Sequence, residues 1–382
     1  MVEIGISGRP SSGKSSFFKA ATLIDVKISP VPFTTIEPNV GITYVTAPCV
    51  CKEFNVRCKP REGACINGVR FIPIKIWDLP GIVPGAHLGR GLGLKFLDDV
   101  RQASALIHVV DFSGLTNEEG NPTSGYDPAK DIEFLEDEIN KWFASIISKA
   151  IQKIGRLGST SELVEVLTQQ LSGLQVTRKH VQETLNKVSI TDVENFSKKL
   201  REISKPLIIA ANKIDLKSSQ ENFERLKGKY KNIIPTSAEA EIALKKAASK
   251  GLIEYSGFDG FKITGPVDEK QKKALEFIQE QVINKYGSTG VLECLNKAVF
   301  DVLGHIVVYP VEDENKLSDK SGNVLPDAFL MPPGSTALDL AFKVHTEIGQ
   351  NFICAIDGRT KKRLGKEYLL KNGDVIKIVA GR

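Results

Sequence analysis

Short apolar runs alternate with amphipathic segments along most of the chain. Four runs have the pattern of buried strands, namely Val2–Ser7, Phe71–Asp78, Ala105–Asp111 and Pro206–Lys213. Segments in which apolar residues recur at helical spacing lie between them. This alternation predicts an α/β fold, a mostly parallel sheet with helices on both faces.

The segment between the third and fourth of these strands is helical in pattern and too long for a simple connection. Ser159–Glu162 and Thr191–Glu194 both fit the capping box, in which a hydroxyl and a carboxylate satisfy free amides at a helix start. We therefore predict a helical, coiled-coil-like insertion at residues 115–205, set into a domain formed by residues 1–114 and 206–304.

From about residue 305 the pattern changes again. Apolar runs at 305–311, 351–358 and 370–379 predict strands, and 335–349 predicts one capped helix that ends at its final glycine. A sheet of four or five strands crossed by one helix would form a separate domain, residues 305–382.

The composition is that of an ordinary globular protein, with 41% hydrophobic and 25% charged residues in a chain of 382. No apolar run approaches the roughly 18 residues that a membrane span needs. Met1 is not followed by the basic and apolar segments of a signal peptide. We expect a cytoplasmic protein that does not bind membranes, and a monomer.

A glycine-rich turn follows the first strand and opens a helix. Its sequence, GRPSSGKS, fits G-x-x-x-x-G-K-[ST] in full. In such a loop, backbone amides at a helix start surround the phosphates, the lysine adds positive charge and the last hydroxyl ligates Mg²⁺. The residues expected to hold the nucleotide here are Gly8, Arg9, Pro10, Ser11, Ser12, Gly13, Lys14, Ser15 and Ser16, with Ser15 also ligating Mg²⁺.

Two further motifs come after their own strands. Asp78 and Gly81 belong to a D-x-x-G pattern, in which the aspartate holds Mg²⁺ and the glycine amide meets the γ-phosphate. Asn212-Lys213-Ile214-Asp215 would read the base, because a carboxylate can accept hydrogen bonds from both N1–H and the exocyclic amine of guanine. We expect the base to be bound by Asn212, Lys213 and Asp215, with Ser237 and Ala238 adding a backbone amide.

Two segments correspond to the switches of a nucleotide hydrolase. In PFTTIEPNVG, Thr34 and Thr35 both qualify on spacing as a Mg²⁺ ligand, and either one could instead cap a turn. Ile82 occupies the position of the usual water-orienting glutamine, and isoleucine cannot orient water. His87 and Arg90 lie nearby, but such residues in a glycine-rich loop are more often at the surface. The sequence therefore offers no firm catalytic residue.

These motifs together resemble the Obg-like GTPases, in particular their YchF subfamily, the Obg-like ATPases, in an archaeal-type version. The resemblance rests on PFTTIEPNVG, on DLPGIVPGAHLGRGLGLKFL, on the helical insertion before NKID and on the C-terminal LMPPGSTALDLAFKVHTEIG. It implies a P-loop G domain, a C-terminal TGS domain with a β-grasp (ubiquitin-like) fold, and Thr35 as the switch residue that ligates Mg²⁺.

The chain departs from this family pattern at three places. Most bacterial and eukaryotic members have glutamate where this chain has Asp215 and prefer ATP, so Asp215 favours GTP. Ser11 replaces an asparagine tied to potassium-assisted hydrolysis in related GTPases. Residues 115–127 lack the candidate catalytic histidine of the bacterial relatives.

Four cysteines fall within 17 residues: Cys49, Cys51, Cys58 and Cys65. In a cytoplasmic protein such a cluster indicates zinc. The spacing C-x-C-x₆-C-x₆-C lacks the C-x₂-C pairs typical of zinc sites, so a disulfide or plain packing remains an alternative.

The end of the chain is basic. Residues 357–382 contain eight basic and three acidic residues, an excess equal to the net charge of +5 of the whole chain. On composition alone this segment fits either an RNA backbone contact or a solvated charged face, and the TGS resemblance favours RNA. We expect a GTP-binding switch with slow hydrolysis that binds the ribosome or its rRNA. The alternatives are an ATP-hydrolysing protein and a nucleotide-gated scaffold with negligible turnover.

Overall fold

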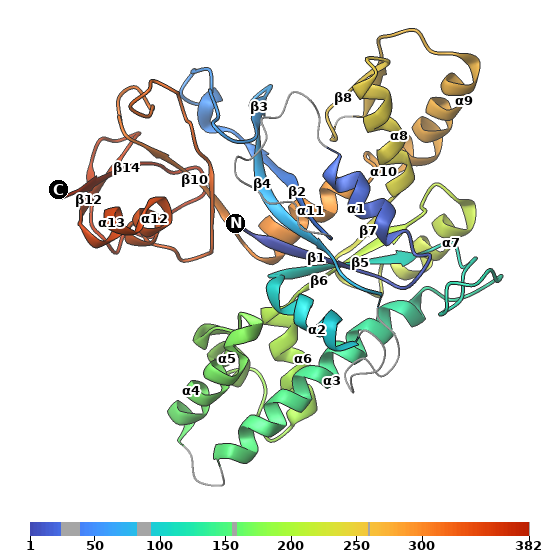
Figure 1. The fold of residues 1–382 in the computed structure, drawn as a ribbon, viewed down its shortest axis with the longest axis horizontal. Coiled ribbons are helices and arrows are strands. Elements are labelled where there is room, and N and C mark those ends of the chain that lie inside the picture. The colour runs from blue at the N-terminus through green and yellow to red at the C-terminus, as the bar shows by residue number, and fades with distance from the viewer. Residues whose placement is uncertain (24–38, 82–92, 155–158, 259, 382) are drawn as a thin grey trace.

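A seven-stranded sheet occupies the centre of the computed structural model, which describes residues 1–23, 39–81, 93–154, 159–258 and 260–381 (Figure 1). The strand order is β2-β4-β1-β5-β6-β7, with β3 paired to β4. The strands are β1 (Glu3–Ser7), β2 (Val40–Pro48), β3 (Ala64–Ile66), β4 (Val69–Asp78), β5 (Ala105–Asp111), β6 (Leu207–Asn212) and β7 (Ile233–Pro235).

The four strands predicted from the sequence are β1, β4, β5 and β6, and they run parallel to one another. Every residue of β5 and β6 is buried, as expected for central strands of a sheet covered on both faces. The prediction missed β2 and β3, which run antiparallel to β4 and hold the four-cysteine segment between them.

Helices cover both faces of this sheet. One apolar layer includes residues of α1, α8 and α11, and the opposite layers include residues of α2, α3 and α7. A hairpin and further helical turns follow α8. The bounds are α1 (Lys14–Thr22), α2 (Gly93–Gln102), α7 (Lys217–Leu226), α8 (Ala238–Ser249), β8 (Ile253–Tyr255), β9 (Phe261–Ile263), α9 (Glu269–Ile278), α10 (Asn284–Tyr286) and α11 (Val291–Asn296).

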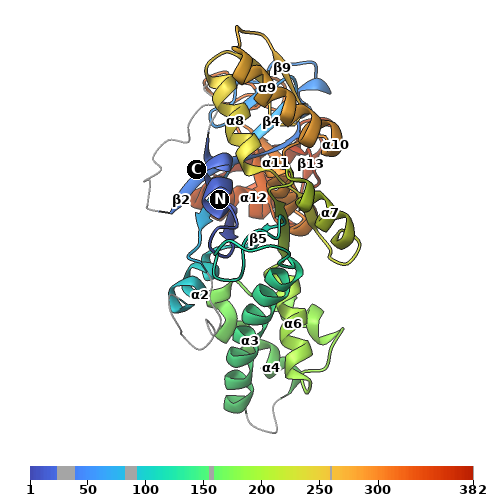
Figure 2. The same ribbon diagram turned by 90° about the vertical axis from the view of Figure 1, so that its right-hand side faces the viewer.

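Four helices form a projection that extends away from the sheet, drawn in green in Figures 1 and 2. They are α3 (Ala129–Ile154), α4 (Thr160–Leu171), α5 (Arg178–Leu185) and α6 (Val193–Ser204). The capping box predicted at Ser159 is present. The one predicted at Thr191 is wrong, because Asp192 caps α6 while the Thr191 hydroxyl contacts Ser189. Among the described residues no helix is both long and apolar enough to cross a membrane.

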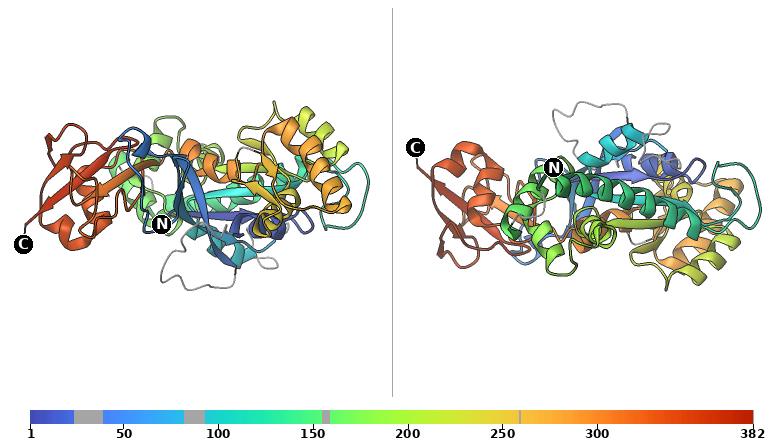
Figure 3. Two further views of the ribbon diagram at one scale, coloured as in Figure 1. Left: turned by 90° about the horizontal axis from the view of Figure 1, so that it is seen from above. Right: turned by 90° about the horizontal axis from the view of Figure 1, so that it is seen from below.

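The C-terminal part lies at one end of the molecule, opposite the β8–β9 hairpin (Figure 3). Its five strands have the order β11-β10-β14-β12-β13, with central β10 and β14 parallel. The elements are β10 (Ile306–Val311), β11 (Phe329–Met331), α12 (Ala337–Val344), α13 (Thr346–Gln350), β12 (Phe352–Asp357), β13 (Arg363–Leu364) and β14 (Val375–Ala380).

The single helix predicted for residues 335–349 is two helices. His345 has extended backbone angles, φ −164° and ψ 142°, and it ends α12 and caps α13. Gly349 does not end the helix. It lies within α13, where the Phe342 ring fills the space that a side chain would take.

Candidate nucleotide-binding site

The predicted phosphate-binding loop joins β1 to α1, at the carboxyl edge of the sheet. The first hydrogen bond of α1 runs from the Phe17 amide to the Gly13 carbonyl, which leaves the amides of the first helical turn available to a ligand. Gly13 has φ +89°, and a Cβ there would lie 2.2 Å from Nδ2 of Asn212. A Cβ on Gly8 would lie 2.6 Å from the Val109 carbonyl oxygen. Both positions therefore require glycine.

The loop also contains a buried polar atom that no described residue satisfies. The Ser12 hydroxyl is buried and has no hydrogen-bond partner. An unpaired buried hydroxyl is costly, and a phosphate oxygen at this loop would accept its proton. The chemistry of the loop thus fits an anionic ligand.

The groups predicted to bind phosphate and Mg²⁺ lie beside one another. The Lys14 ammonium donates a hydrogen bond to the Asp78 carboxylate at the end of β4. Gly81 lies near the loop, since a Cβ added to it would be 3.9 Å from the Gly8 carbonyl oxygen. Ser15 is exposed at the start of α1, which leaves its hydroxyl free for a metal. Thr35, Ile82, His87 and Arg90 lie outside the described residues.

Asn212 joins the phosphate loop to the predicted base-binding elements. Its Nδ2 donates to the Ser12 carbonyl oxygen at 2.9 Å, and its Oδ1 accepts from the Ala238 amide at 3.1 Å. The Ala238 amide, expected to face the base, is thus engaged in holding Asn212. Ser237 caps α8 and donates its hydroxyl proton to Oδ1 of Asp215 at 2.7 Å. This contact fixes the carboxylate that would read the base.

Lys213 is held by a residue that the sequence did not single out. Its Nζ donates to Oδ2 of Asp111, at the end of β5, over 2.8 Å. Burial by itself would raise the pKa of Asp111, but hydrogen bonds from Lys213, Ser113 and Thr116 outweigh it and hold the pKa below its usual value. The carboxylate is therefore ionised at neutral pH, and it keeps the lysine stem beside the site.

Arg9 contacts the helical projection. Its guanidinium forms a buried ion pair with Asp131 at 2.9 Å, and it lies 4.2 Å from the centre of the Phe134 ring. Tyr126 also donates to Asp131, at 2.8 Å. Arg9 was predicted as a nucleotide-binding residue, but its side chain is committed to α3. No sequence pattern predicts this contact, because its two residues are more than a hundred positions apart.

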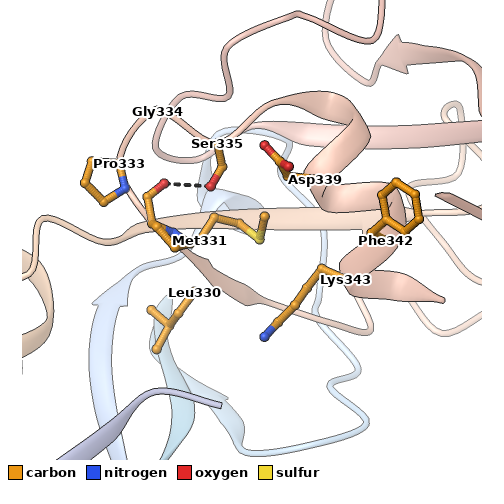
Figure 4. A pocket seen from close by; sticks show the side chains of 9 residues that line it. Leu330, Met331, Pro333, Gly334, Ser335, Asp339, Phe342 and Lys343 are labelled. Carbon is orange, nitrogen blue, oxygen red and sulfur yellow. Dashed lines mark hydrogen bonds between the residues drawn. The ribbon is translucent and has the colours of Figure 1, made fainter. Parts of the chain in front are cut away.

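The cavity in Figure 4 lies in the C-terminal domain and not at the phosphate loop. It has a volume of about 510 Å³, and Leu330, Ser335, Asp339 and Lys343 are among its lining residues. The Asp339 carboxylate is already used, since it accepts from the amide and hydroxyl of Thr336 to cap α12. This cavity has no phosphate-binding loop, so the nucleotide site is assigned to the carboxyl edge of the central sheet.

Three family models match parts of the chain. A model described as "50S ribosome-binding GTPase" matches residues 3–153. One described as "Obg-like GTPase YGR210-like, G4 motif-containing domain" matches residues 210–313. A TGS domain model matches residues 321–380.

Curated relatives extend over nearly the whole chain. An uncharacterised GTP-binding protein of Methanocaldococcus jannaschii is 51% identical and covers 100% of this chain and 99% of its own length. An uncharacterised GTP-binding protein of Schizosaccharomyces pombe is 37% identical, over 87% of this chain and 88% of its own. The ribosome-binding ATPase YchF of Bacillus subtilis is 26% identical, over 97% of each.

Two solved structures share the architecture. A GTP-binding protein from Pyrococcus horikoshii OT3 has a TM-score of 0.77 at 40% identity, over 100% of both chains. The YchF GTPase of Schizosaccharomyces pombe has a TM-score of 0.58 at 20% identity, over 99% of this chain and 97% of its own, and supports the fold. Fold and site define a P-loop GTPase with a C-terminal TGS domain. The chain belongs to the Obg-like GTPase family, and YchF proteins are among its relatives.

Proposed function

We propose that the protein binds GTP and GDP with Mg²⁺, hydrolyses GTP slowly, and acts as a monomeric, cytoplasmic switch on the ribosome. The observation that carries this proposal is the set of contacts made by Asn212. One side chain bonds both the phosphate loop and the start of α8, so it sets the spacing between the phosphate and base sites.

Phosphate binding is assigned to Gly8–Ser16 and Gly81. Mg²⁺, which supplies charge neutralisation of the β- and γ-phosphates when bound, would be ligated by Ser15, Thr35 and Asp78. In the free protein Lys14 pairs with Asp78. Nucleotide binding would replace this pair, because the lysine then faces phosphate and the carboxylate faces the metal.

Base recognition is assigned to Asn212, Lys213, Asp215, Ser237 and Ala238. An Asp215 carboxylate held by Ser237 presents two acceptor oxygens, and guanine offers two donors on one edge. Adenine offers no such pair, so the site should prefer guanine nucleotides. A measured preference for ATP would instead support the activity named for the Bacillus subtilis relative.

The proposal of slow hydrolysis rests on Ile82, which stands at the position of the usual water-orienting glutamine. An isoleucine cannot orient the attacking water, so turnover would rest on the phosphate loop and Mg²⁺. The expected rate is on the order of 10⁻³ s⁻¹ or less, as for an unassisted small GTPase. A partner that adds the missing group would raise this rate.

The ribosome is proposed as that partner. A family model and a relative carry ribosome binding in their descriptions, and the C-terminal domain is basic. Some of its basic side chains are already paired, since Arg359 bonds Glu53 and Lys377 bonds Glu314. Lys361 donates to carbonyl oxygens of its own loop and the neighbouring one. Those left exposed for an RNA backbone include Lys362, Arg363, Lys366 and Lys371.

The test is steady-state hydrolysis of GTP and ATP, with and without ribosomal subunits, over a range of salt. We expect GTP turnover to rise at least several-fold with subunits and the effect to weaken as salt increases. Lys362→Glu with Arg363→Glu should reduce the stimulation and leave intrinsic hydrolysis unchanged. The matched control is Lys270→Glu with Lys273→Glu, on exposed positions at α9. Fast turnover that subunits leave unchanged would contradict the proposal.

A further inference from the structure

The four cysteines of the β2–β3 connection converge in space. Cys49 caps a short helical turn just after β2 and Cys51 lies within that turn, while Cys58 lies in the loop that follows and Cys65 is on β3. Their four sulfur atoms all lie within 4.8 Å of one another. The Cys49–Cys58 and Cys51–Cys65 sulfur distances are 3.4 and 3.7 Å.

These distances fit metal coordination better than covalent bonding. A disulfide requires sulfur atoms about 2.05 Å apart, and all four cysteines are free. Four thiolates around a tetrahedral zinc, each about 2.3 Å from the metal, lie about 3.8 Å from one another. The irregular spacing in the sequence is no obstacle, because the ligands come from separate segments that strand pairing brings together.

A buried positive charge beside the cluster lacks a negative partner. Arg70 is opposite Cys65 in the β3–β4 pair, so both side chains leave the same face of the sheet. The guanidinium is 1% exposed and donates to the Leu325 and Pro326 carbonyls, each at 2.9 Å. Among the described residues it has no carboxylate partner, and a buried charge without one is costly.

A buried hydroxyl points to the same place. Tyr309, on β10, is fully buried, and its hydroxyl has no hydrogen-bond partner among the described residues. It lies close enough to Cys49 and Arg70 to interact with both side chains. A thiolate bound to a metal accepts hydrogen bonds, as outer-shell groups around metal sites commonly require.

We propose that Cys49, Cys51, Cys58 and Cys65 bind one structural zinc ion. On binding, each thiol releases its proton to solvent and its sulfur donates an electron pair to Zn²⁺, with no change of oxidation state. The complex carries a formal charge of −2. That charge compensates the positive charge of Arg70. The Tyr309 hydroxyl donates a hydrogen bond to the Cys49 sulfur.

The zinc site holds the TGS domain against the central sheet. The same connection supplies several of the contacts between them. The Lys59 amide donates to the Val324 carbonyl at 2.9 Å, and the Arg61 amide donates to that of Pro326 at 3.0 Å. Glu53 pairs with Arg359 at 2.6 Å. With zinc bound by all four cysteines, this long loop has one conformation, which places these groups opposite their partners in the TGS domain.

The first test is metal content and thiol state of the full-length protein purified without chelator. We expect one zinc per chain, with four thiols protected from alkylation until zinc is removed. Four freely reactive thiols without metal would overturn the site, as would a mass four hydrogens lower, which marks two disulfides. Stoichiometric iron would overturn the assignment to zinc.

Substitutions locate the ligands. Cys58→Ser and Cys65→Ser, both at half-buried positions, should each lower zinc retention against a competing chelator at least tenfold. Cys354→Ser, also half-buried but on β12, is the matched control and should retain zinc. Should a variant fail to fold, cobalt titration of the zinc-free wild type gives an independent measurement. Absence of the intense visible absorption of a tetrahedral cobalt thiolate would overturn the proposal.

Hydrogen exchange tests the consequence for the domain contact. Zinc removal should speed exchange of the Lys59 and Arg61 amides at least tenfold. The Leu79 amide, which bonds Ile6 within the central sheet, should not change. Unchanged exchange at Lys59 and Arg61 would overturn the role of zinc in holding the domain. GDP affinity should be the same with and without zinc, so this result is independent of the nucleotide proposal.

Discussion

Two buried arginines, one in the phosphate loop and one on β4, each contact another part of the molecule. Arg9 joins the phosphate loop to the helical projection, and its charge is balanced by Asp131 at 2.9 Å. Arg70 joins the sheet to the TGS domain through carbonyl oxygens, beside four cysteines. The first contact is electrostatically complete within the chain. For the second, the proposed zinc–thiolate complex would supply the missing negative charge, and the contact would then depend on metal supply and redox state.

The largest predicted effect comes from breaking the complete contact. Arg9→Met leaves Asp131 buried without its ion-pair partner, and burial already raises the pKa of that carboxyl. We expect the free energy of unfolding to fall by about 3–5 kcal/mol, measured by urea denaturation.

The control for this variant is an exposed ion pair on the same domain. Arg225 and Asp127 lie 2.8 Å apart with about half of each side chain exposed. Arg225→Met should cost about 1 kcal/mol or less, because solvent screens such pairs. Equal effects at Arg9 and Arg225 would show that burial does not distinguish the two contacts.

A second prediction concerns the stability of the fold at low pH. His108 lies under the Arg9 contact, with its ring nitrogens near the Ser7 hydroxyl and the Asp131 carbonyl, and burial lowers its pKa to about 4. The unfolded chain, with a histidine pKa near 6.5, therefore binds more protons between pH 6.5 and 4. As the pH is lowered from 6.5 to 4, the free energy of unfolding should therefore fall, by at most about 3 kcal/mol from this residue.

The measurement is unfolding of wild type and His108→Gln over the same pH series. Subtracting the two curves cancels the contributions of the other titrating groups. The difference should vary between pH 6.5 and 4 and be constant above that range. A constant difference throughout would mean that His108 titrates equally in the folded and unfolded states.

The third prediction contrasts two cations of one loop. Lys14 pairs with Asp78 at the nucleotide site, whereas Arg9 pairs with Asp131 of the helical projection. Lys14→Ala should weaken GDP–Mg²⁺ binding by about 2–3 kcal/mol, roughly a hundredfold, and leave the unfolding midpoint nearly unchanged. Calorimetry and thermal melts measure both quantities. Wild-type GDP affinity would refute our placement of the phosphates.

The smallest effect is expected at the base. Asp215→Asn exchanges one acceptor oxygen for a donor and should remove most of the preference for GDP over ADP, worth about 1–3 kcal/mol. Competition binding with the two nucleotides measures the ratio. Equal affinities in the wild type would remove the argument for a guanine site.

The sequence predicted what local chemistry determines. The phosphate loop requires a left-handed Gly13 and a strand before a helix, and both requirements are visible in eight residues. The helix break at His345 and the Asp192 cap were missed, because each depends on competition between neighbouring side chains. The sequence indicated the four cysteines as a candidate metal site, but their convergence and the Arg9–Asp131 pair could not be predicted, for another reason. They exist only after segments distant along the chain have packed.

Strand β4 connects the nucleotide site to the contact with the TGS domain. Asp78 ends it beside Lys14, and Arg70 lies near its start, against the TGS domain. Ten residues at roughly 3.3 Å each make a rod about 30 Å long, hydrogen-bonded to neighbours along both edges. The pairing along both edges makes this strand stiff, so the nucleotide site and the contact with the TGS domain lie at a fixed separation along one element.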